Sequence, residues 1–283
     1  MTRERDGQMA LADALLATAE ARSVVALSLS PVFERRWPSV YTALQRGRLD
    51  SERLSGLYLK MATRQGSRYW VVDATTWPRS EARTLPERGF HHVATTTAGT
   101  PVGIGHRYAT VGVVADERGS WVLPLKHERV PLEESEVVFA ARQVRQLVAH
   151  TTIRPLVLAD SLYAGPLWLR ETHDLPIDTL ARLRPNRALY RRPVRRPMGR
   201  PALDGPVLNL RRPETWQDPD DEQVVQDSAL GTVTLSLWRS LHFKTAREHE
   251  VTVIRVALSS RAGSNTSPPK PLWLMYAGAT PFD

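Results

Sequence analysis

The sequence predicts an α/β fold, a mixed sheet with flanking helices, and two observations support this. Between residues 68 and 184, apolar runs of strand length alternate with helical patterns in the order strand, strand, strand, helix, strand, helix, strand. Hydrophobic residues make up 42% and charged residues 24% of the 283 residues, as in soluble globular proteins. The chain is long enough for one large domain or two ordinary ones.

Residues 1–66 read as an N-terminal helical region. Residues 8–27 (QMALADALLATAEARSVVAL) are rich in Ala and Leu at helical spacing. Residues 51–66 (SERLSGLYLKMATRQG) open with a Ser-Glu start signal and stop near Gly66. Trp37-Pro38 marks a break between helices, because a residue before proline disfavours helical geometry. This region predicts no chemistry.

Residues 67–185 carry the first part of the predicted sheet. Strands are expected at 68–77 (RYWVVDATTW), 106–116 (HRYATVGVVAD) and 119–130 (GSWVLPLKHERV), the last two joined by a turn at 117–119. An amphipathic helix is expected within 131–150, because acidic residues occupy its first turn. A strand in 153–165 (IRPLVLADSLYAG), a short helix in 165–174 and a strand in 177–184 follow.

Residues 186–271 read as an Arg/Pro-rich and β-rich basic insertion that leaves the sheet and later returns to it. The stretch 182–212 is expected to be mostly loop, because its prolines disfavour helix and central strand. An acidic turn at 218–223 (DPDDEQ) precedes two paired strands at 231–243 and 248–260. After a loop at 264–271, residues 272–283 begin with the last core strand, LWLMYAG.

Composition excludes several classes of function. The chain has no cysteine, so disulfides, thiolate chemistry and Cys-based zinc sites are excluded. No apolar run is long enough for a membrane span and no secretory signal is visible, so we expect a cytoplasmic protein. The net charge of +8 is carried mostly by arginine, which favours a nucleic-acid partner. The alternative is an ordinary solvated surface with an arginine bias.

Two aspartates occupy equivalent places in the pattern. Asp73 and Asp160 each follow the apolar run of a predicted core strand, and sites in α/β sheets form at such strand ends. Mg²⁺ is commonly held by one or two carboxylates together with waters and substrate phosphate. Each aspartate could equally be a turn residue at the end of a strand, so both interpretations remain open on this pattern alone.

The order of several motifs along the chain gives further information about these two aspartates. The segment VVDATTWPRSEARTLPERGFHH is followed by VLADSLYAG and then by RLRPNR. In this order they resemble the catalytic domain of the DDE transposases of bacterial insertion sequences, from about residue 68 to the end of the chain. The resemblance implies an RNase H-like fold with Asp73 and Asp160 as the first two metal-binding carboxylates. It also implies Mg²⁺ (with Mn²⁺ as substitute), cleavage of double-stranded DNA at transposon ends, and attack of the freed 3′-hydroxyl on target DNA.

The resemblance implies a homodimer as well, because two DNA ends are paired, and a nucleoid-associated location. The family's third acid, a glutamate on a helix after the last strand, has no match before the chain stops at Asp283. Glu222, Glu248 and Glu250 are poorly placed to replace it, so we expect a C-terminally truncated copy. The alternative function is a non-catalytic DNA-binding remnant or regulator of transposition.

Arginines are the candidate DNA contacts. Arg79 and Arg88 flank the loop after the first aspartate and could hold phosphates; the alternative is a surface ion pair. The second group is expected to follow the phosphate backbone without reading sequence. It comprises Arg182, Arg184, Arg187, Arg191, Arg192, Arg195, Arg196 and Arg200.

The remaining motifs give little indication of function. His91 and His92 would point to opposite faces of an extended chain and so cannot easily share a metal ion, and His106 reads as structural. Residues 99–106 (GTPVGIGH) are glycine-rich but lack the Lys-Ser/Thr of a phosphate-binding loop, which argues against a nucleotide cofactor. The short MGRP segment at 198–201 gives only a weak hint of a minor-groove arginine.

Overall fold

The computed structural model describes residues 4–20, 23–64, 66–92, 102–115, 121–194, 202–259 and 269–280. The chain forms two compact units, Met1–Leu54 and Ser55–Asp283. Each unit has its own cluster of buried apolar residues.

The first unit is helical. Ser23 begins its second helix, because the serine side chain accepts a hydrogen bond from the Ala26 N–H at 3.0 Å. Pro38 occupies the first turn of the third helix, where its missing N–H costs nothing. The described helices of this unit are α1 (Arg5–Ala17), α2 (Val24–Ser28) and α3 (Pro38–Arg46). Their small core consists of Leu11, Ala14, Leu27, Phe33 and Val40.

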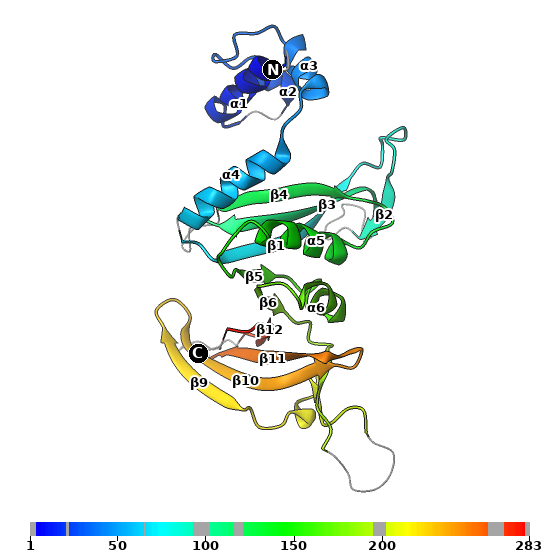
Figure 1. The fold of residues 1–283 in the computed structure, drawn as a ribbon, viewed down its shortest axis with the longest axis vertical. Coiled ribbons are helices and arrows are strands. Elements are labelled where there is room, and N and C mark those ends of the chain that lie inside the picture. Colours follow the sequence, from blue (N-terminus) through cyan, green and yellow to red (C-terminus); the bar gives the residue numbers. More distant parts are fainter. Residues whose placement is uncertain are drawn as a thin grey trace. The chain divides into compact units, whose positions relative to one another are not determined.

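The second unit is built on one mixed sheet (Figure 1). Its twelve described strands run in the order β2-β3-β1-β5-β6-β12-β11-β10-β7-β8, with β4 also paired to β3 and β9 to β10. The strands of the first part are β1 (Tyr69–Pro78), β2 (Gly89–His92), β3 (Val102–Val114), β4 (Val122–Val130), β5 (Leu156–Ala159) and β6 (Asp178–Arg182). Those of the second part are β7 (Ala188–Arg191), β8 (Val207–Asn209), β9 (Asp221–Asp227), β10 (Gly231–Phe243), β11 (Ala246–Leu258) and β12 (Leu272–Ala277).

The first part confirms the predicted mixed α/β fold and is consistent with an RNase H-like arrangement. β1 pairs antiparallel with β3 and parallel with β5, and β5 pairs parallel with β6. The predicted strands and helices occur in the predicted order. One strand was not predicted: β2, which follows the loop between Arg79 and Arg88, pairs antiparallel with the first residues of β3.

One face of this part is covered by helix α5 (Glu136–Val148), which crosses β1 and β3 in Figure 1. Alternate residues of β1, Trp70 and Val72, point into the core beneath it, as do Val111 and Val113 of β3. Helix α4 (Ser51–Arg64) adds Leu59 and Ala62 to the same core. The period-2 pattern of β1 therefore buries Trp70 and Val72 and leaves Asp73, Thr75 and Trp77 exposed on the opposite face.

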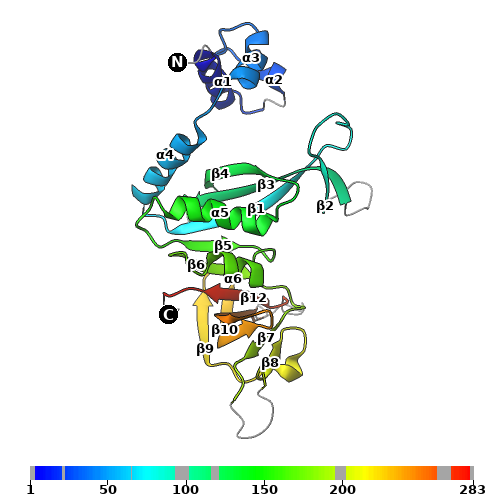
Figure 2. The same ribbon diagram turned by 45° about the vertical axis from the view of Figure 1, so that its right-hand side comes forward.

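The insertion does not leave the sheet, contrary to the prediction. β10 and β11 form the expected antiparallel pair, but β11 also pairs with β12, which pairs with β6. Strands β7 to β11 therefore extend the same sheet, and β7 and β8 lie next to β10 in Figure 2. The segment expected to be loop contains β7 and β8, and Asp221–Gln223, expected in an acidic turn, begin β9. These strands were missed because tertiary pairing overrode local proline and charge signals.

Candidate active site at the carboxyl ends of two strands

Asp73 and Asp160 occupy neighbouring positions on two parallel strands. The pairing of β1 with β5 ends with Val72 opposite Ala159, and each aspartate is the next residue of its strand. Asp160 directly follows β5, as predicted. Asp73 does not end β1, which continues to Pro78 while paired only with β3. Asp73 thus marks the end of the parallel pairing, and both aspartates are exposed.

The electrostatics of the two carboxylates show that they interact. The pKa of Asp73 is raised, first by partial burial of its carboxyl group and then by the negative charge of Asp160. Hydrogen bonds from the Ala74 N–H and the Thr75 side chain oppose that rise. Asp160 is held by its own turn, because its Oδ1 accepts from the Leu162 N–H at 2.8 Å. The strand register therefore holds two negatively charged carboxylates, those of Asp73 and Asp160, near each other.

Tyr163 lies next to the two aspartates. Its side chain is completely buried, and its hydroxyl has no hydrogen-bond partner among the described residues. The pKa of Tyr163 is strongly raised, first by burial and then by the charges of Asp73, Asp160 and Glu136. Its ring packs edge-on against Trp168 at 5.3 Å between centroids, which anchors the turn that carries Asp160.

The two carboxylates fit a hard divalent cation. Mg²⁺ is held in many proteins by one or two carboxylates, with waters and substrate phosphates as further ligands. Burial and then the negative charge of Asp160 raise the pKa of Asp73, and a bound cation would relieve the repulsion between the two carboxylates. Across the described parts of the chain, no group of three His, Asp or Glu residues is arranged to hold a metal ion.

The glutamates considered as a third acid are engaged elsewhere. Glu222 accepts a hydrogen bond from Ser236 at 2.9 Å on the neighbouring strand. Glu250 binds Arg192 at 2.6 Å, and Glu248 lies 3.7 Å from the Nε of Arg170. Glu136, whose charge reaches Tyr163, is paired with Arg107 at 2.7 Å.

Two of the predicted DNA-contacting arginines lie beside the aspartates. The pairing of β5 with β6 ends with Ala159 opposite Ala181, so the next residues, Asp160 and Arg182, are in line across the two strands. Arg184 donates from Nε to the hydroxyl of Ser161 at 3.0 Å, directly after Asp160. Both arginines are exposed, so their charge is available next to the two carboxylates.

Other arginines of this group are bound to acidic side chains or partly buried. Arg191 makes a bidentate pair with Asp220, both contacts at 2.9 Å, and Arg192 pairs with Glu250. Arg187 is partly buried, and its Nε has no acceptor among the residues that the structure describes. Arg195, Arg196 and Arg200 lie outside the described residues.

Arg79 and Arg88 have different environments. The guanidinium of Arg79 lies over the Trp77 ring, 3.7 Å from its centroid. Arg88 donates to the carbonyl oxygens of Arg79, Ser80 and Arg83, which fixes the loop between them. His91 and His106 are buried and bind the carbonyl oxygens of Gly105 and Pro86, as expected for structural histidines.

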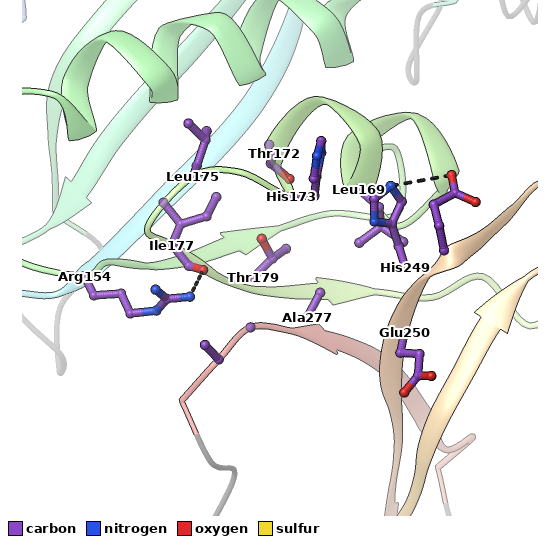
Figure 3. Close-up of a pocket in the computed structure, with 13 residues that line it drawn as sticks. Arg154, Leu169, Thr172, His173, Leu175, Ile177, Thr179, His249, Glu250 and Ala277 are labelled. Atoms are coloured by element: carbon purple, nitrogen blue, oxygen red, sulfur yellow. Dashed lines mark hydrogen bonds and ion pairs between the residues drawn. The ribbon is translucent and has the colours of Figure 1, made fainter.

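The side chains in Figure 3 line a cavity of about 290 Å³, whose lining includes neither Asp73 nor Asp160. It is formed by α6 (Pro166–Thr172) and by parts of β6, β11 and the chain after β12. Thr179 places it at the amino end of β6, whereas Asp160 follows the carboxyl end of β5. His173 and His249 lie there with ring centroids 4.9 Å apart. The cavity and the aspartate pair are therefore distinct places in this unit.

Sequence reasoning missed Asp178, the first residue of β6. Its side chain is 1% exposed and accepts a hydrogen bond from Arg154 Nε at 2.8 Å. The Ala279 N–H at 3.0 Å and the Thr280 hydroxyl also donate to it. Burial alone would raise the pKa of Asp178, but these hydrogen bonds and the Arg154 charge hold it below its ordinary value. Asp178 therefore links the start of β6 to Arg154 and to the residues after β12.

No helix in the described parts of the chain has both the length and the apolar character needed to cross a bilayer. No curated protein matches the chain. Residues 1–241 match a family of proteins described as DDE superfamily endonuclease. That description corresponds to a transposase-type nuclease, whose substrate is DNA and which generally uses divalent metal ions. Because the match covers well over half of its 283 residues, the chain belongs to the DDE superfamily endonucleases.

Proposed function

We propose that this protein is a transposase that cleaves DNA at the ends of an insertion sequence and joins the freed 3′-hydroxyl to target DNA. The observation that carries the proposal is the strand register, which brings Asp73 and Asp160 together at the end of the β1–β5 pairing. Membership of the family supports the nuclease class, and the register supports this pair of aspartates as the site of the reaction.

Asp73 and Asp160 would hold Mg²⁺, or Mn²⁺ as its substitute. When bound, such ions activate an attacking oxygen and stabilise the leaving oxygen of a phosphodiester. The protein's own contribution is to fix both carboxylates on adjacent strands, with Asp160 oriented by the Leu162 N–H. Arg182 and Arg184 would hold the DNA phosphates beside them, because a guanidinium fork matches phosphate oxygens.

The proposed partner is double-stranded DNA, both the element's ends and the target, which places the enzyme at the nucleoid. The net charge of +8 favours such a polyanion. A homodimer is part of the proposal, because two DNA ends must be brought together.

Nicking of supercoiled plasmid in Mn²⁺ tests the proposal. The wild-type chain would be compared with Asp73→Asn and Asp160→Asn, which keep the shape of each side chain and remove its charge. Asp227→Asn is the matched control, because Asp227 is exposed and accepts hydrogen bonds from the Ala229 and Leu230 N–H groups of its own turn. We expect nicking by the wild type and the control and none by the two site variants. Nicking that persists in Asp73→Asn would refute the assignment.

A non-catalytic DNA-binding protein is the second candidate. It is favoured by the finding that no group of three metal-binding side chains occurs within the described ranges. Under this alternative, Arg184→Ala weakens DNA binding, while the wild type binds DNA and does not nick it in Mn²⁺ or Mg²⁺. Gel-shift and nicking assays on the same preparations separate the two functions.

A further inference from the structure

A row of aromatic side chains crosses the sheet on the same face as Asp73. Along β1 this face carries Asp73, Thr75 and Trp77, the residues that alternate with the buried ones. The β1–β3 register places Thr75 opposite Tyr108. The β3–β4 register places Thr110, the neighbour of Tyr108 on this face, opposite His127. The side chains of Trp77, Tyr108 and His127 therefore form a diagonal across three strands, which we call the aromatic row.

The rings of the aromatic row are in contact with one another. Trp77 and Tyr108 have ring centroids 6.1 Å apart at 57°, and Tyr108 and His127 are stacked with centroids 5.1 Å apart at 4°. The Arg79 guanidinium covers one part of Trp77. Trp77 is nevertheless 48% exposed, and His127 is exposed as well.

The surroundings hold the aromatic row in place without burying it. His106, opposite Trp77 on β3, is buried and bonded to the Pro86 carbonyl, so the loop before β2 packs against this end of the row. The same loop is fixed by the three carbonyl contacts of Arg88. Arg129 of β4 forms an ion pair with Glu87 of this loop. The aromatic row is therefore a preformed surface that requires no rearrangement before binding.

Such a surface suits the flat face of a nucleic-acid base. Aromatic side chains on an open sheet face stack bases in several single-strand-binding modules, and a guanidinium adds a cation–π contact. In a continuous duplex the bases cover one another, so only an unpaired base presents its face to such a row. Asp73 and Trp77 are four residues apart on one strand, about 13 Å at 3.3 Å per residue.

We propose that the aromatic row binds unpaired bases of the DNA strand within a few nucleotides of the phosphate that Asp73 and Asp160 engage. This inference rests on the proposed function, because it takes DNA as the substrate. It assigns to Trp77, Tyr108 and Arg79 a contact with bases, whereas Arg182 and Arg184 contact phosphates. The protein would therefore prefer DNA ends that are unpaired or easily opened.

Fluorescence anisotropy with three labelled DNA probes tests this subsite. The first is a blunt duplex, the second carries a four-nucleotide single-stranded tail, and the third carries an abasic tail with the same phosphates and no bases. We expect the wild type to bind the base-containing tail at least about fivefold more tightly than the abasic tail, the lower end of the effect of losing one stacked base. That comparison requires no variant, so it does not depend on how a substituted chain folds.

Variants then locate the effect. Trp77→Ala should remove the preference for the base-containing tail, and Trp77→Phe should restore part of it. Trp121→Ala is the matched control, because Trp121 is 79% exposed and lies outside the aromatic row, and it should keep the preference. Wild-type protein that binds both tails equally, or a preference that survives in Trp77→Ala, would overturn the subsite while leaving the proposed DNA chemistry standing. Failure of the wild type to bind any probe would overturn both.

Discussion

Removal of the buried Asp178 carboxylate should strongly destabilise the second unit. The side chain is 1% exposed and receives hydrogen bonds from Arg154, Ala279 and Thr280, so Asp178→Ala leaves several donors without their acceptor. Breaking a buried ion pair by deleting one partner costs about 3–5 kcal/mol. Arg154 is 37% exposed and can regain water, so we expect the lower end, about 3 kcal/mol, for the free energy of unfolding.

Guanidinium denaturation followed by tryptophan fluorescence measures this loss. Trp216, Trp238 and Trp273 form a cluster with centroids 5.1 to 6.5 Å apart, and Trp273 is in β12, directly upstream of the segment bound by Asp178. Thr280→Ala removes one of the hydrogen bonds and should cost about 1 kcal/mol. The double variant should cost less than the sum of the two, because both changes remove the same contact.

The pH dependence gives an independent check. The folded-state pKa of Asp178 is lower than its unfolded value, so its contribution is complete above about pH 4 and is lost as the pH falls through the folded-state pKa. Asp178→Ala should therefore flatten the acid limb of the stability curve. A loss below about 1 kcal/mol at pH 7, with an unchanged acid limb, would refute the argument that this carboxylate ties the end of the described chain to β6.

Five further predictions concern the site and the elements around it. Asp73→Asn should raise the melting temperature of the metal-free protein, because the raised pKa of Asp73 means that its charged form is disfavoured in the fold; a scanning-calorimetry shift downward would contradict this. The affinity for Mn²⁺, measured by calorimetry, should fall as the pH drops through the raised pKa of Asp73, because the protonated carboxyl binds a cation poorly. Asp160→Asn should lower the pH midpoint of the Asp73 titration, followed by NMR, because it removes the neighbouring negative charge. Gly105→Ala should prevent stable folding, because the added Cβ would lie 2.1 Å from a backbone oxygen of β1. In Gly56→Ala in α4 the added Cβ meets nothing within 4 Å, so this variant should stabilise the fold by about 0.5–1 kcal/mol. Equal unfolding midpoints for the two variants would contradict this prediction. Arg88→Ala should make the loop before β2 more susceptible to limited proteolysis, and an unchanged digestion pattern would show that its three carbonyl contacts do not order that loop.

The neighbouring placement of Asp73 and Asp160 was predictable because its signal is local. An apolar run that ends in a carboxylate is visible in residues 69–73 and again in 156–160, and the α/β pattern places the two runs in one sheet. The aromatic row could have been found by the same period-2 counting, because Thr75 and Trp77 continue the face of Asp73. The pairing of Trp77 with Tyr108 and His127 could not have been predicted in this way. It depends on the register between β1, β3 and β4, which the sequence of a single strand does not determine.

The sequence by itself predicted the class of fold, the N-terminal helices, the order of the first strands and the two candidate aspartates. Each of these depends on hydrophobic periodicity or on a position next to an apolar run, which are properties of a few neighbouring residues. The tertiary structure decided where the insertion strands went, that Asp178 is a buried anchor, and which arginines remain beside the carboxylates. These outcomes depend on pairing and burial between residues far apart in the chain. Arg184 and Arg191 are alike in sequence context, yet one bonds Ser161 beside Asp160 and the other is bound by Asp220. Local sequence cannot distinguish them, because the charge that a side chain meets is set by the fold around it.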